Sequence, residues 1–421
     1  MKLMTTTALA LAAAAFAAPA AAQQYGAQPA VQIPTGPTAP AAAVTAPEKK
    51  IVLSKEAGKT IIDLQKSVQA NDSANIPAKL AAAKAVAKSP DDKFAIGQLQ
   101  RQAATAANDL AGIADATDYL AASGYLTGDV VASLYNAAGI KYFNAKDFAR
   151  AVTMFQKGST ADPKGFESVR LLGEAKNSLG QTAEAATLMQ RSLQMARAAG
   201  QKPAEGDFKR AVSVAYNAKL PVAVDLGRMW VSAYPNAESW RNAIAIYRNM
   251  MRPGVQGSLD LLRLARAAGG LSTAGDYSLY ATAAADQGNF AEAQSVLDEG
   301  LAAQRVKTSD SVIRDTLAGL KTKPKAGAAE LNASAKAAQG GASLIKIADR
   351  FYGIGDYARA AELYREAIAK GGADANLANL HLGMALARSG DKAGAATALK
   401  GVGGAHADVA KYWLLYVGGA A

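Results

Sequence analysis

A short helical hairpin recurs along this chain, and the recurrence limits the fold more than any other feature. Residues 132–163 read ASLYNAAGIKYFNAKDFARAVTMFQKGSTADP, two amphipathic stretches with a polar break between them. Apolar or small residues recur three or four positions apart in each stretch, which predicts two helices that each have one apolar face. Asp162 and Pro163 end the unit, because proline cannot continue a helix. A hairpin this small cannot bury its apolar faces alone, so it must stack against further copies.

Further copies follow in phase with the first. Gly139 is answered 34 residues later by Gly173, and Ala151 by Ala185. Three more copies are marked by a bulky or apolar residue before a small one and by a later turn: Tyr280 and Ala281 with residues 288–293, Ile347 and Ala348 with residues 355–360, and Leu382 and Gly383 with residues 390–392. Repeated helical hairpins of this period indicate a repeat protein.

These units resemble the tetratricopeptide repeat, in which a bulky residue precedes a small glycine, an aromatic residue follows, and alanines mark the crossing of the second helix. The resemblance implies an all-α fold, a right-handed superhelical solenoid of antiparallel helix pairs. It also implies a concave groove lined by the first helix of each pair. At about 34 residues per unit, residues 51–421 have room for ten or eleven units.

The N-terminus has the pattern of an export signal. Residues 1–22 carry a lysine at position 2, continue with a short alanine-rich apolar run, and end in three alanines before Gln23. This resembles a secretory signal peptide with a small-residue cleavage site. The alternative is a membrane anchor, for which the run is short. We therefore expect an exported protein that does not span the membrane, most simply in a bacterial periplasm. The chain has no cysteine, which excludes disulfides and a lipidated cysteine after the signal.

Residues 23–50 contain five prolines among alanine, glycine, threonine and glutamine. Such a composition lacks apolar periodicity and is typical of an extended spacer. We interpret this segment as a disordered linker. A proline-rich ligand for another domain is the alternative.

The repeats divide the remaining chain into six segments. We expect divergent helical repeats over 51–128, tetratricopeptide repeats over 129–200, divergent repeats over 201–271, a further repeat over 272–320, a connector over 321–341, and repeats with a C-terminal capping helix over 342–421.

Three places leave alternatives open. The turn at residues 250–257 is long and contains Pro253, so it indicates either a divergent helix pair or an exposed functional loop. Residues 321–341 have few large apolar residues and fit either a flexible joint or a lightly packed helix. The aromatic segment 409–417 predicts a helix that covers the open end of the stack, with a partner-docking patch as the alternative.

The charge balance points to acidic partners. The formal net charge is +11, which favours anionic partners in general. An export signal argues against nucleic acid, and the basic residues are interleaved with acidic ones, as on a solvated helix face. Attraction to anionic envelope lipids, polysaccharide or an acidic protein is the functional alternative.

The sequence contains no recognised catalytic motif. The hydrolase, P-loop and zinc-protease signatures G-x-S-x-G, G-x-x-x-x-G-K-[ST] and H-E-x-x-H are all absent. The two histidines are His381, which we expect in the core or groove, and His406, in a glycine-containing loop. We therefore predict no catalytic residue, no cofactor and no metal, and a protein that is not an enzyme.

The resemblance places the functional surface in the groove. Carried over through the repeats, the partner-binding positions are Asn136, Arg170, Asn177, Arg241, Arg248 and Asn249. Arginine and asparagine can hold a carboxylate or a peptide backbone through directed hydrogen bonds. The alternative is that these residues are merely solvated.

The resemblance does not extend to one subgroup of the family. Ile140 and Glu174 stand where the carboxylate-clamp subgroup carries asparagine, which argues against recognition of a C-terminal carboxylate. The expected function is an exported, non-catalytic scaffold that binds a protein in its groove. A polysaccharide- or lipid-associated envelope factor that acts through a basic surface is the alternative.

Overall fold

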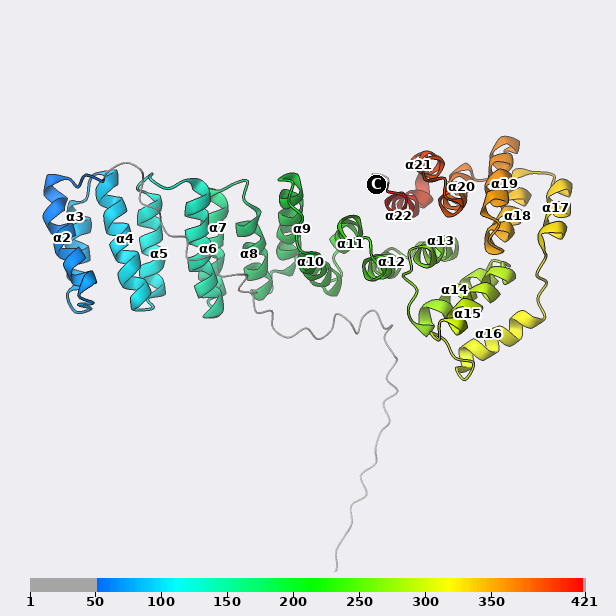
Figure 1. Cartoon of the computed structure of the whole chain (residues 1–421), viewed down its shortest axis with the longest axis horizontal. Helices are drawn as coiled ribbons and strands as arrows, with labels where there is room; N and C mark the ends of the chain where they lie inside the picture. Colours follow the sequence, from blue (N-terminus) through cyan, green and yellow to red (C-terminus); the bar gives the residue numbers. More distant parts are fainter. Residues whose placement is uncertain (1–50, 419–421) are drawn as a thin grey trace, which may run out of the picture. The chain divides into compact units, whose positions relative to one another are not determined.

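The structure is a computed structural model of the 421-residue chain and describes residues 51–418 (Figure 1). The predicted signal peptide, residues 1–22, and the predicted linker, residues 23–50, lie outside the described residues. Within the described part the chain forms α-helices and one short 3₁₀-helix, with no strand. The expected all-α solenoid of antiparallel helix pairs is confirmed.

The helices follow one another in pairs along the first part of the chain. Their bounds are α2 (Lys55–Gln69), α3 (Ile76–Val86), α4 (Pro90–Ala106), α5 (Leu110–Ala121), α6 (Gly128–Asn144), α7 (Phe148–Ala161), α8 (Phe166–Ser178), α9 (Thr182–Ala198), α10 (Glu205–Asn217), α11 (Val222–Ala233), α12 (Ala237–Met251) and α13 (Gly254–Ala267).

The second part continues with α14 (Ala274–Asp286), α15 (Phe290–Ala302), α16 (Ser311–Lys321), α17 (Ala328–Ala337), α18 (Gly341–Gly353), α19 (Tyr357–Lys370), α20 (Ala375–Ser389), α21 (Lys392–Lys400), the 3₁₀-helix η1 (Gly404–His406) and α22 (Ala407–Tyr416).

Small residues let the two helices of a pair approach closely. In α6 and α7, a Cβ on Gly139 would collide with the ring of Phe155, and Ala151 is completely buried. In α20 and α21, a Cβ on Gly383 would collide with the side chain of Leu399. Bulky residues at these crossings would force the helices apart, since packed interiors leave no spare volume. The glycines and alanines of the sequence pattern therefore lie where the two helices of a pair cross.

The turns inside three of the pairs, α6–α7, α18–α19 and α20–α21, are built in the same way. Asp147, Asp356 and Asp391 each accept a hydrogen bond at the start of the second helix, from a backbone N–H three residues later. This is a helix N-cap, which satisfies one of the otherwise unpaired N–H groups of the first turn. The residue before each aspartate has a positive φ, and Gly355 meets this need without strain whereas Lys146 does not.

The predicted long turn at residues 250–257 is only two residues long. Helix α12 ends at Met251 and α13 begins at Gly254. Arg252 takes the left-handed conformation, with φ of 48° and ψ of 63°. That conformation reverses the chain at once, so Pro253 becomes the N-cap and residues 254–257 form the first turn of α13. The structure therefore supports the divergent helix pair, and the alternative of an exposed functional loop is wrong.

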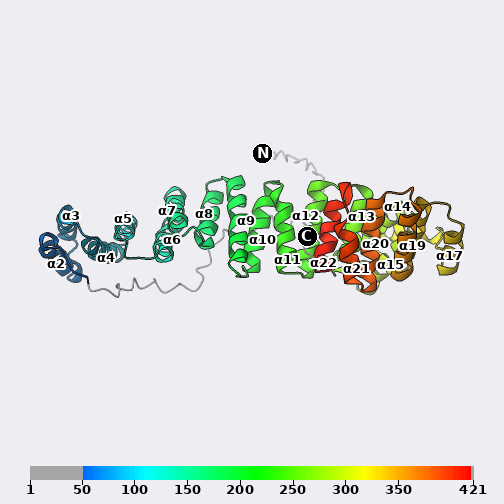
Figure 2. The ribbon, with the colours of Figure 1, turned by 90° about the horizontal axis from the view of Figure 1, so that it is seen from above.

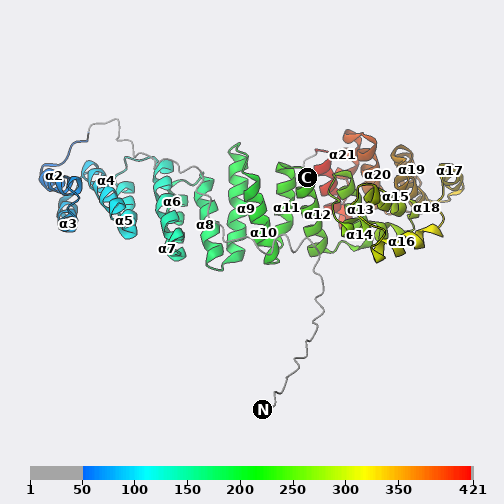
Figure 3. The same cartoon turned by 60° about the horizontal axis from the view of Figure 1, so that its bottom comes forward.

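The connector is largely helical. Helix α17 occupies its centre, and two of its side chains, Leu331 and Ala335, are buried among residues of the later repeats. Helix α16 precedes it and packs on α14 and α15 (Figure 3). The lightly packed helix, rather than the flexible joint, describes this segment.

The last helix packs on the final helix pair, α20 and α21, and also contacts α11 and α13 (Figures 1 and 2). The hydroxyl groups of Tyr412 and Tyr416 donate to the carbonyl oxygens of Ala243 and Ala267, each at 3.3 Å. Trp413 is completely buried. The aromatic side chains of α22 thus join the last helix to α12 and α13.

Candidate functional site: the inner face of the repeats

The six residues predicted for the groove lie on three first helices. Asn136 is on α6, Arg170 and Asn177 are on α8, and Arg241, Arg248 and Asn249 are on α12. Asn249 is exposed and the other five are half-buried. No hydrogen bond or ion pair within residues 51–418 joins two of the six to each other. We call these residues, together with those that link their helices through α10, the α6–α12 face.

Ion pairs connect α8 to α10 and α10 to α12 on this face. Arg210 on α10 donates to both carboxylate oxygens of Glu174 on α8, at 3.1 Å to Oε1 and 2.9 Å to Oε2. Lys209 on α10 donates to Glu238 on α12 at 2.7 Å. Paired guanidinium and carboxylate groups fix geometry as well as charge. The ladder therefore holds the spacing of the three helices.

Two of the predicted residues also bridge neighbouring elements. The amide of Asn249 donates to the hydroxyl of Tyr216 on α10 at 3.0 Å. The guanidinium of Arg241 donates to the hydroxyl of Ser272, just before α14, at 2.8 Å. These contacts leave most of the Arg241 donors available, because a guanidinium carries five N–H groups.

Arg170 is held within its own helix. Its guanidinium donates to both oxygens of Glu167, at 2.9 and 2.6 Å. The Glu167 carboxylate raises the pKa of Arg170, against the opposite effect of burial. This arginine is therefore fixed in position but carries a compensating charge beside it.

Arg248 has no such compensation. Its Nε is buried without a hydrogen-bond partner, and the side chain forms no ion pair with a described residue. Burial lowers the pKa of Arg248, whereas the negative charge of Asp276 acts to raise it. The amide oxygen of Asn136 on α6 is likewise buried without a partner. Unsatisfied buried polar groups cost stability, so they mark positions where an additional partner would be favourable.

The same inner positions recur in the C-terminal repeats. Asp349 on α18 stands at the repeat position that Glu174 occupies on α8, and Tyr352 stands at the position of Asn177. Each carboxylate also pairs with a cation on the next first helix. Oδ1 of Asp349 lies 2.8 Å from Nδ1 of His381 on α20, as Glu174 meets Arg210.

A buried ionic network surrounds this C-terminal pair. Arg263 on α13 donates to Glu292 on α15 at 2.9 and 2.8 Å and to Asp260 at 3.2 Å. Its guanidinium carbon lies 4.8 Å from the ring centroid of Tyr352, and Nη1 is 3.9 Å from Asp349. Arg263 has an exposed fraction of 1%, so this charge is removed from water entirely.

His381 completes the network. Its Nε2 lies 3.2 Å from Oδ1 of Asp260, and its Nδ1 faces Asp349. Burial would lower the pKa of His381, but the two carboxylates outweigh it and raise the pKa to about 10. Burial would raise the pKa of Asp349, but His381 and Arg263 lower it to about 2. The imidazolium and the carboxylate therefore remain charged at neutral pH.

This network was missed from the sequence, although His381 was expected in the core or groove. One signal was available: Asp260 and Arg263 interrupt the apolar run of residues 259–265 in a helix that is otherwise leucine-rich. Charged residues in such a run are almost never fully buried unless they are paired. The local pattern does not indicate the partners, because Glu292 and His381 lie on other helices farther along the chain.

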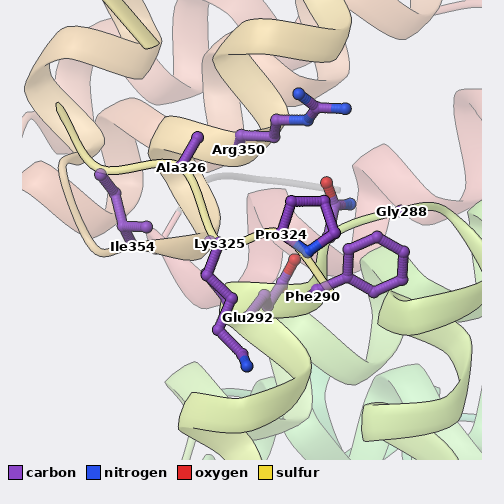
Figure 4. A pocket seen from close by; sticks show the side chains of 11 residues that line it. Gly288, Phe290, Glu292, Pro324, Lys325, Ala326, Arg350 and Ile354 are labelled. Atoms are coloured by element: carbon purple, nitrogen blue, oxygen red, sulfur yellow. The ribbon is translucent and has the colours of Figure 1, made fainter. Parts of the chain in front are cut away.

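Two hollows among the described residues lie outside the six groove positions. A cleft of about 510 Å³ lies between the first two helix pairs, lined mainly by apolar residues of α2 to α5. Gln100 lines it, and its Nε2 donates to Asp115 while its Oε1 has no donor. A pocket of about 60 Å³ lies where the start of α15, residues 324–326 and the end of α18 meet (Figure 4).

The described residues hold no group of three or more histidine, aspartate or glutamate side chains placed to bind a metal. In the C-terminal network the position between the carboxylates is filled by Arg263. Residues 51–418 also contain no helix long and apolar enough to cross a membrane.

Comparison with solved structures gives a weak likeness. A chain in the structure described as "Structure of Naa15/Naa10 bound to HypK-THB" is 15% identical, with 85% of this chain and 60% of that chain covered and a TM-score of 0.24. The chain thus spans 60% of the length of that solved chain. A likeness of this size carries no argument about fold or function.

Comparison with protein families is informative. The family model for the tetratricopeptide repeat matches residues 136–203 and residues 345–406, whereas no curated protein matches the sequence. The first matched segment contains most of α6 and all of α7 to α9, and the second contains most of α18 and all of α19 to α21. These segments include the pairs α6–α7, α18–α19 and α20–α21, whose aspartate caps are described above. Both matched segments are therefore tetratricopeptide repeats, which have the architecture of a protein-interaction scaffold.

Proposed function

We propose that this protein is an exported, non-catalytic scaffold of the cell envelope that binds a protein partner on the α6–α12 face. Tetratricopeptide repeats support the protein-binding part of the proposal. The export part is supported by the signal-like pattern of residues 1–22, and the periplasm is the compartment that this pattern favours.

One observation carries the choice of surface. On α12, Arg241 and Arg248 form no ion pair with a described residue, and the Nε of Arg248 is buried without a partner. A carboxylate or backbone carbonyl oxygen of a bound protein would accept hydrogen bonds from the remaining N–H groups of these two guanidinium groups. Charge-assisted hydrogen bonds of this kind are about twice as strong as neutral ones.

Site-specific photo-crosslinking tests the surface. A photoreactive amino acid at Asn177 or Asn249 should crosslink to one protein in the intact envelope. The same residue at Thr187, which is exposed on the second helix α9, is the matched control and should not. Crosslinks of equal yield from Thr187 would place the partner elsewhere.

Alanine substitution tests the residues. Arg241→Ala and Arg248→Ala should each lower the affinity for the captured partner by about tenfold or more, as expected for loss of a hydrogen bond to a charged group. Lys307→Ala, an exposed cation outside the face, should leave the affinity unchanged. Unchanged binding by both arginine variants would refute the assignment.

Two further measurements address the compartment and the alternative partner. N-terminal sequencing of the fractionated protein should show cleavage near Gln23 in the periplasmic fraction, and an intact Met1 in the cytosol would refute export. Vesicles containing anionic lipid should bind weakly. Tight binding that is lost as salt rises would instead favour an envelope factor acting through its basic charge.

A further inference from the structure

The two matched repeat segments present equivalent inner positions, but these positions differ in what covers them. Asn177 on α8 is half-buried and has no side-chain partner among the described residues. Tyr352, at the same repeat position on α18, has an exposed fraction of 5%. The inner face of the C-terminal repeats is therefore closed at a position where that of α8 is accessible.

The element that closes it is α13, the second helix of an earlier pair. Its Arg263 stacks on the ring of Tyr352 and lies beside Asp349, both on α18. Its Asp260 pairs with His381 on α20, and Gln256, one turn earlier, lies 3.2 Å from the same imidazole. Three successive turns of α13 thus contact the first helices of the two C-terminal repeats.

The burial of α13 shows that it has neighbours on every side. Its residues 259–265 are all buried, including the charged Asp260 and Arg263. A helix buried all round lies within a core rather than on a surface. Helix α20 is buried in the same way over residues 380–387. Each of these helices packs in its own pair and also covers the other.

Helix α22 secures this arrangement. The indole N–H of Trp413 donates to the backbone carbonyl oxygen of Asp260 at 3.2 Å. Trp413 also packs within the same hydrophobic cluster as residues of α13 and α20. The contact fixes α13 at the residue that carries the charge paired with His381.

We propose that α13 is an intramolecular ligand of the C-terminal repeats, seated on the inner face of α18 and α20 through Asp260 and Arg263. This face is accordingly closed to other proteins. The binding proposed above is confined to the α6–α12 face, and this part of the inference rests on that proposed function. A helix with an aspartate and an arginine three residues apart is the kind of ligand that α18 and α20 accept.

Opposite charges face one another where α13 is seated. The carboxylates of Asp260, Asp349 and Glu292 face the cations Arg263 and His381, and the hydroxyls of Tyr280 and Tyr364 donate to Glu292 and Asp349. Removing one member leaves an uncompensated buried charge. Loss of Arg263 alone should therefore loosen α13 from α18.

Cysteine accessibility tests the proposal, because the chain has no native cysteine. Asn177→Cys and Tyr352→Cys would be introduced separately into the full-length protein and labelled with N-ethylmaleimide. We expect Tyr352→Cys to react about a hundredfold more slowly than Asn177→Cys, because it must wait for local opening. Equal rates in natively folded variants would overturn the proposal.

A second substitution shows whether α13 is the cover. Adding Arg263→Gln to Tyr352→Cys should speed labelling by about tenfold or more, since the cover then opens more often. Ala360→Cys, which lies in α19 and is completely buried, should remain protected in the same Arg263→Gln background. Arg314→Gln, at an exposed ion pair, should change neither rate.

The two outcomes against the proposal are distinct. If Arg263→Gln leaves Tyr352→Cys protected, α13 is not held there by its arginine. If Ala360→Cys and Tyr352→Cys become reactive together, α13 is an inseparable part of the repeat core and not a ligand of it. Neither result depends on an external partner, so failure here differs from failure of the photo-crosslinking experiment.

Discussion

Arg263 donates two hydrogen bonds to the carboxylate of Glu292, at 2.9 and 2.8 Å, and both side chains are buried. Breaking a buried pair from one side strands a charge in a medium that solvates it poorly. We predict that Arg263→Met lowers the free energy of unfolding by about 3–5 kcal/mol. Tryptophan fluorescence during urea unfolding measures this, because Trp230, Trp240 and Trp413 are all buried in one cluster with parts of α13 and α20.

Arg314→Met is the matched control for that measurement. The pair between Arg314 and Asp315 is exposed, at 59% and 70% for the two side chains. Its loss should change the free energy of unfolding by less than about 0.5 kcal/mol. A similar effect from both variants would mean that the network contributes no more than a surface pair.

The second prediction concerns pH. The pKa of His381 is about 10 in the folded chain and near 6.5 in the unfolded one. Between these values the folded protein holds a proton that the unfolded protein releases, so stability should fall as pH rises. The expected slope is up to about 1.4 kcal/mol per pH unit. His381→Asn should remove this slope, and parallel curves for the two proteins from pH 7 to 10 would contradict the assignment.

The third prediction concerns the crossing of α6 and α7. A methyl group at Gly139 would overlap the ring of Phe155, so Gly139→Ala should destabilise the protein by about 1–3 kcal/mol through overpacking. Gly319 lies in α16 with open space around it. Gly319→Ala should therefore stabilise by about 0.5–1 kcal/mol, because glycine is unfavourable inside a helix. Thermal unfolding followed by circular dichroism gives both values.

The fourth prediction concerns the turn between α6 and α7. Lys146 has φ of 62°, whereas the equivalent turns at Gly180, Gly288, Gly355 and Gly390 carry glycine. The left-handed conformation costs a residue with a Cβ about 1–2 kcal/mol. Lys146→Gly should raise the midpoint of thermal unfolding, and Gly355→Ala should lower it. No change in either variant would show that these turns adjust without strain.

The helix pairs could be predicted because their signals are local. Gly139 and Gly173 mark crossings, and Asp147 and Asp356 mark turns, each within one repeat. The positions of the six groove residues followed from the same phase, and the structure places them on first helices. Their role in binding stays a prediction, because contacts with a partner depend on residues outside this chain.

The remaining features depend on contacts distant in sequence. The pairing of Asp260 with His381 joins residues 121 positions apart, and no local period encodes it. The aromatic residues of α22 indicated an apolar helix but not which surface it covers. Its contacts with α11 and α13 join segments more than 140 residues apart, so the prediction of a covering helix did not include them.

A double-mutant cycle between Asp260 and His381 measures whether α13 is seated against α20. Asp260→Asn, His381→Asn and the double variant would be unfolded in urea and compared with the native chain. We predict a coupling energy above about 1 kcal/mol, as found for residues in direct contact in one network. Additive effects, within about 0.3–0.5 kcal/mol, would show that the two side chains do not meet and would contradict the account.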